Sequence, residues 1–149
     1  MIGSNDDRKR PRTLAEAQGM TAELGRAIAG IANEELEAGR LETAREILQG
    51  LAVSNPYDAA SWMMLAVLER RRGKLPIARI CAETAYRLAP RDAQVRLVRA
   101  EVLLCTPPER PRAVAELRCL ADLEGLIGAR ARALLAAAGD CGPGPAASV

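Results

Sequence analysis

The sequence contains no histidine and no phenylalanine, and its only aromatic residues are one tryptophan and two tyrosines. Histidine is the commonest general base and metal ligand near neutral pH, so its absence argues against most acid–base and metal-dependent enzymes. There is also no glycine-rich phosphate loop, and no acidic pair stands apart from the helical repeats described below. We therefore expect a protein that is not an enzyme and that uses no cofactor and no metal ion.

The four cysteines, Cys81, Cys105, Cys119 and Cys141, form no C-x-x-C pair, which argues against a zinc knuckle or a thioredoxin-like site. Three of them fall within predicted helices, where we expect small buried side chains in a reducing compartment. Cys141 falls in the C-terminal tail, where we expect an exposed thiol.

Long apolar runs are missing, and residues 1–12 are too polar for a signal peptide. We therefore predict a cytoplasmic protein without membrane insertion. The formal net charge is only +2, and its arginines are spread along the chain rather than gathered in one block. This balance predicts no nucleic-acid partner.

Alanine and leucine, both strong helix formers, make up most of the apolar residues, and they favour an all-α fold. The central stretch 58–92 predicts two amphipathic helices joined by a tight turn. Asp58 is a good N-cap, Gly73 can end the first helix in a left-handed conformation, and Pro90 ends the second.

This stretch matches the preceding one after a shift of 34 residues, a period typical of paired-helix repeats. The coinciding positions are Ala32 and Ala66, Glu35 and Glu69, Gly39 and Gly73, Leu41 and Leu75, Ala44 and Ala78, Arg45 and Arg79, Pro56 and Pro90, and Asp58 and Asp92.

The repeat resembles the tetratricopeptide (TPR) family, whose characteristic slots are occupied here by Trp62, Leu65, Ala66, Gly73, Ala78 and Pro90. The resemblance implies an all-α solenoid of three helix-turn-helix units, at about 25–58, 59–92 and 93–122. An N-terminal helix would precede these units, and disordered tails are expected at 1–12 and 139–149.

The N-terminal region has two interpretations: one long helix to Ala38, or a short helix before the first unit. Thr13 and Glu16 form a capping-box pattern, and Gly19 can interrupt a helix before Thr21 restarts it, so we prefer the second interpretation.

The third unit departs from the pattern, since Pro107, Pro108 and Pro111 replace the glycine turn; its second helix should carry Ala113, Leu117 and Leu120. A capping helix at 126–138 should cover the last open face of the stack. We assign this covering role to Leu126, Ile127, Ala131, Leu134 and Leu135.

In TPR proteins the first helix of each unit lines an inner groove that binds peptides. The resemblance implies a peptide-binding groove with an apolar centre and a charged edge. Its residues are Arg26, Ala29, Asn33, Leu36, Met63, Val67, Arg70, Gln94, Leu97, Glu101 and Leu104. Open apolar side chains of this kind usually mark a binding surface. The alternative is that the N-terminal segment or a second copy of the chain covers them.

Two short motifs are similar to those of bacterial type III secretion chaperones of the TPR class: Tyr57-Asp58-Ala59 at the unit junction, and Arg99-Ala100-Glu101-Val102-Leu103-Leu104 in the third unit. This resemblance implies a chaperone that holds a translocator or needle subunit before export. A general TPR scaffold in another bacterial assembly is the alternative. A small co-chaperone and a homodimer are both left open.

Overall fold

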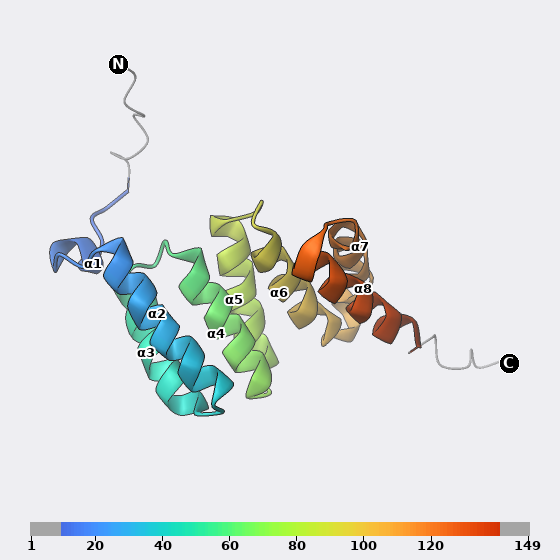
Figure 1. Ribbon diagram of the computed structural model, residues 1–149, viewed down its shortest axis with the longest axis horizontal. Helices are drawn as coiled ribbons and strands as arrows, with labels where there is room; N and C mark the ends of the chain where they lie inside the picture. The colour runs from blue at the N-terminus through green and yellow to red at the C-terminus, as the bar shows by residue number, and fades with distance from the viewer. Residues whose placement is uncertain (1–9, 141–149) are drawn as a thin grey trace, which may run out of the picture. The chain divides into compact units, whose positions relative to one another are not determined.

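The computed structural model describes residues 10–140, and every element within that range is helical (Figure 1). The elements are α1 (Leu14–Ala17), α2 (Ala22–Glu37), α3 (Leu41–Ser54), α4 (Ala59–Arg71), α5 (Leu75–Leu88), α6 (Ala93–Leu104), the 3-10 turn η1 (Pro107–Glu109), α7 (Arg110–Ala121) and α8 (Gly125–Asp140). The predicted all-α fold of helical hairpins is confirmed. The pairs α2/α3, α4/α5 and α6/α7 are the three hairpins, and α8 follows them.

The chain divides into two compact units, Met1–Tyr57 and Asp58–Val149, which are described separately below. The boundary falls at the junction between the first and second hairpins. Residues 1–9 and 141–149, which include most of the predicted disordered tails and Cys141, lie outside the described residues. α8 continues to Asp140, beyond the predicted end at Ala138.

The first unit begins with α1, a short helix separate from α2, as the preferred interpretation of the N-terminal region predicts. The Thr13 hydroxyl accepts from the Glu16 amide, and the Glu16 carboxylate accepts from the Thr13 amide, so the predicted capping box is confirmed. Hydrogen bonds from Arg10 and from the Thr13 backbone lower the pKa of Glu16 below its usual value. Gly19, with a φ of 71°, separates α1 from α2.

The first two hairpins turn in the same way because their glycines occupy the same place in the repeat. Gly39 and Gly73 have φ values of 78° and 74°, a conformation that glycine adopts without steric cost. After each glycine the next amide bonds back across the turn, Arg40 to the Glu35 carbonyl at 2.9 Å and Lys74 to the Glu69 carbonyl at 2.8 Å. These bonds satisfy carbonyls that the helix ends leave free.

Small residues pack the hairpin interiors, as the repeat predicts. Ala32 and Ala44 in the first unit, and Ala66 and Ala78 in the second, are fully buried. Asp58 and Asp92 cap α4 and α6 by accepting from the amides of the first helical turn.

The third hairpin has η1 in place of the glycine turn. Charged side chains join both η1 and α6 to α5. Arg79 on α5 bonds Glu109 on η1 at 2.6 Å. Arg99 on α6 is buried, bonds Glu83 on α5 at 2.9 Å, and stacks on the Tyr86 ring at 4.0 Å. The predicted core positions Ala113, Leu117 and Leu120 are all fully buried.

The last helix packs on α6 and α7, as the capping role requires. Its Ala131 is buried in one cluster with Leu97, Leu117 and Leu120, and Ile127, Leu134 and Leu135 pack against that cluster. The prediction for Leu126 is wrong, because its side chain is 90% exposed. Leu126 shares a helical stripe with exposed Arg130 and Ala133, on the side of α8 away from the cluster.

Candidate functional site

The predicted groove residues divide between the two compact units. Arg26, Ala29, Asn33 and Leu36 follow one stripe of α2 in the first unit. Arg26 and Asn33 are exposed, Ala29 is half-buried, and Leu36 is buried with 3% of its surface exposed. The side chain of Leu36 therefore offers no open apolar contact, contrary to the prediction.

The second unit brings the other predicted residues onto neighbouring helices, since α6 packs against both α4 and α8. Met63, Val67 and Arg70 share a stripe of α4, and Gln94, Leu97, Glu101 and Leu104 share a stripe of α6. We call Met63, Val67, Arg70, Gln94 and Glu101, together with Arg130 of α8, the lead-helix surface.

Charged side chains join the three helices of the lead-helix surface. Glu101 accepts from Arg70 Nη2 at 3.0 Å through one carboxylate oxygen, and from Arg130 Nε at 3.0 Å through the other. The Glu101 side chain is only 11% exposed, whereas that of Arg130 is 54% exposed. Two guanidinium groups around one carboxylate leave one net positive charge, which suits an acidic group on a partner.

Arg70 retains unused bonding capacity in this cluster. Its Nε is buried and has no hydrogen-bond partner within the described part of the chain. A buried donor without a partner is costly, so this arrangement of the Arg70 side chain carries a local penalty. Arg130 was missed by the sequence reasoning because α8 lies outside the three matched units.

The apolar part of the lead-helix surface is smaller than predicted. Met63 and Val67 are half-buried, but Leu97 is only 4% exposed and belongs to the core cluster beneath α8. Leu104 is half-buried and packs against the same cluster. The prediction that Leu97 lies open is wrong, because the capping helix covers it. Whether any of these residues bind a partner stays a prediction.

The cysteines do not all follow the prediction of buried side chains. Cys81 is buried, but Cys105 and Cys119 are exposed. Burial, together with the nearby charge of Glu69, raises the pKa of Cys81 from 9.0 to about 11. Among residues 10–140, no group of three or more histidine, cysteine or acidic side chains is placed to hold a metal ion.

A thiol-labelling experiment should separate the three described cysteines. In a Cys141→Ser variant at pH 8, Cys105 and Cys119 should react rapidly with a maleimide. Cys81 should react only after unfolding, since it is shielded and almost entirely protonated. Because folding raises the pKa of Cys81, its contribution to stability should be present below pH 9 and lost as the pH rises toward about 11. Native labelling of all three thiols, followed by mass spectrometry, would contradict this assignment.

No helix in the described residues is long and apolar enough to cross a membrane.

Comparison with known proteins shows similarity in structure alone. No protein-family model matches the sequence, and no curated protein matches it. The fold is similar to that of the Yersinia enterocolitica type III secretion translocator chaperone SycD, with a TM-score of 0.73 and 18% identity, covering 86% of this chain and 99% of that chain. A type III secretion complex from Aeromonas hydrophila gives a TM-score of 0.73 and 18% identity, covering 87% of this chain and 90% of that chain.

A further structure shows SycD in complex with a peptide of the translocator YopD. It matches with a TM-score of 0.64 and 18% identity, covering 79% of this chain and 94% of that chain. At this low identity, the TM-scores show a shared TPR-like fold. The resemblance predicted from the repeat spacing and the junction motifs is therefore confirmed at the level of structure.

Proposed function

We propose that this protein is a type III secretion chaperone that holds a segment of a secreted translocator or needle subunit before export. The observation that carries the proposal is the match to SycD, which extends over 86% of this chain and 99% of the other. The complex of SycD with a translocator peptide supports a peptide-binding role for the same fold. The proposed compartment is the cytoplasm.

The physical basis of the proposal is the removal of apolar surface from water. A subunit that assembles only after export exposes side chains beforehand that its own assembly will later cover. Contact with Met63 and Val67 would stabilise such a segment by about 25 cal/mol for each Å² of apolar surface buried. Arg70 and Arg130 would add contacts to acidic or carbonyl groups. This competition with premature assembly needs no nucleotide and no covalent chemistry.

The proposal is tested by co-expressing the tagged chain with each secreted subunit encoded at the same locus. One translocator or needle subunit should co-purify in a stoichiometric complex. Met63→Glu should weaken that complex at least tenfold, since it places a carboxylate where an apolar contact is expected.

Ile80→Glu is the matched control, because Ile80 on α5 is 64% exposed and lies outside the lead-helix surface. Circular dichroism should show both variants folded. If no secreted subunit binds and a component of another assembly does, the general TPR scaffold is the correct function. Equal binding by both variants would exclude the lead-helix surface as the site.

A further inference from the structure

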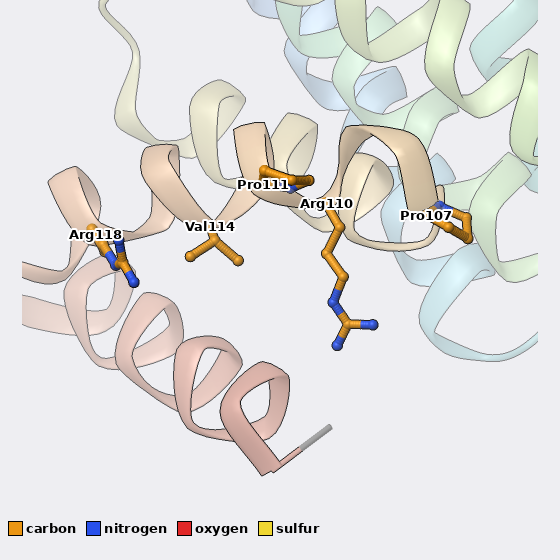
Figure 2. A pocket seen from close by; sticks show the side chains of 5 residues that line it. All are labelled: Pro107, Arg110, Pro111, Val114 and Arg118. Carbon is orange, nitrogen blue, oxygen red and sulfur yellow. The ribbon is translucent and has the colours of Figure 1, made fainter. Parts of the chain in front are cut away.

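A second candidate binding site lies on α7 and shares no residue with the lead-helix surface. It is an open hollow of about 460 Å³, lined by Pro107, Arg110, Pro111, Val114 and Arg118. Figure 2 shows the side chains of Arg110, Val114 and Arg118 pointing to the same side of α7. From the sequence alone, this segment is predicted only to be an unusual turn followed by a core helix.

The hollow contains two arginines that form no ion pair with an acidic side chain among residues 10–139. Arg110 donates only to the Ala138 carbonyl at 3.4 Å, and Arg118 is exposed. Glu109 is engaged by Arg79 and Arg112, and Glu116 by Arg96. Asp122 is the C-cap residue of α7, one turn after Arg118, and forms no ion pair with it. Two arginines without an ion pair to a described carboxylate therefore lie on either side of Val114 along α7, with Pro107 and Pro111 at the Arg110 end.

The spacing of these side chains matches an extended peptide. Arg110, Val114 and Arg118 stand four residues apart on α7, so neighbouring members are separated by about 6 Å along the helix axis. In an extended chain, alternate residues face the same side and are about 6.6 Å apart. A peptide whose first, third and fifth residues are acidic, apolar and acidic would place them opposite Arg110, Val114 and Arg118.

We propose that this hollow binds an extended acidic segment of a partner protein with the pattern acid-x-apolar-x-acid. The carboxylates pair with the two guanidinium groups, and the central apolar side chain packs on Val114 next to Pro111. The charge complementarity selects an acidic segment over a basic or purely apolar one. This site is independent of the proposed chaperone surface, so either can fail without the other.

Isothermal titration calorimetry of the full chain tests the proposal with a nonapeptide centred on Glu-Thr-Leu-Thr-Glu. Threonine at the second and fourth positions favours an extended conformation. The peptide should bind, and its affinity should fall as salt is added. Replacing both acids by glutamine, or the leucine by serine, should weaken binding.

Arg118→Gln should weaken binding about three- to tenfold, the range between an exposed ion pair and a charge-assisted hydrogen bond. Arg118→Lys should retain most of the affinity. Arg87→Gln is the matched control, because Arg87 is an exposed arginine on α5, and it should bind the peptide as the unaltered chain does. Arg118 is exposed, so its variants should melt at the same temperature as the unaltered chain.

Three results would overturn the proposal: no heat of binding, equal affinity for the glutamine peptide, or the same loss in Arg87→Gln as in Arg118→Gln.

Discussion

Replacing Gly128 by alanine should lower the free energy of unfolding by about 3 kcal/mol, the upper part of the usual range for overpacking. A Cβ atom at this position would lie 1.7 Å from the Leu123 carbonyl oxygen and 2.8 Å from its carbon. Both are backbone atoms, so no side-chain rotation can relieve the clash. The first turn of α8 would have to move away, and Ile127 and Ala131 would lose contact with the core cluster.

Urea unfolding followed by circular dichroism measures this effect. Gly139→Ala is the matched control within the same helix, because its added Cβ would meet nothing within 4 Å. The control should change the unfolding free energy by less than about 0.5 kcal/mol. Equal midpoints for the two variants would show that α8 does not dock as described.

Arg72→Ala should cost about 3 kcal/mol, because it removes the guanidinium group that bonds a buried carboxylate. Glu69 is only 2% exposed, and Arg72 Nη1 lies 3.1 Å and 2.9 Å from its two oxygens. Removing one partner of a buried ion pair typically costs 3–5 kcal/mol, but Glu69 keeps other interactions, which limit the loss. The lower end applies here because the Arg72 side chain is 20% exposed.

The double variant Glu69→Leu with Arg72→Leu provides the critical comparison. It removes both charges, so it should recover most of the lost stability. Arg87→Ala, which changes an exposed arginine, should be nearly neutral in the same thermal or urea unfolding experiment. If the double variant is less stable than Arg72→Ala alone, the cost does not arise from the loss of the Arg72 guanidinium beside the Glu69 carboxylate.

Local signals made the hairpins predictable. The aspartates at 58 and 92 and the glycines at 39 and 73 act within a single turn, so their spacing could be read without tertiary information. The buried alanines at 32, 66 and 78 follow from the same period. Confirmation of the short first helix likewise rests on a local capping box.

The site was less predictable because exposure depends on what packs against each helix. Leu97 occupies a groove position in the repeat, but α8 covers it, and no repeat signal fixes where α8 packs. The same uncertainty explains Leu126, whose face of α8 could not be assigned from composition. It also explains why Arg130 was missed as a partner of Glu101, since that contact joins a repeat helix to the helix outside the repeats.

The cysteines show the same limit. Cys105 is the C-cap residue of α6, and Cys119 lies on the exposed face of α7, so membership of a helix did not imply burial. Of the three described cysteines, only Cys81 faces inward with its neighbours Ala78, Ala82 and Ala85.

Site-specific photo-crosslinking in the complex with a secreted subunit tests the central claim most directly. A photoreactive residue placed at Met63 should crosslink to the bound subunit, whereas one placed at Ile80 on α5 should not. Mass spectrometry should locate the Met63 adduct in one continuous segment of the subunit. Crosslinks from Ile80 with none from Met63 would contradict the proposal that the lead-helix surface holds the secreted protein.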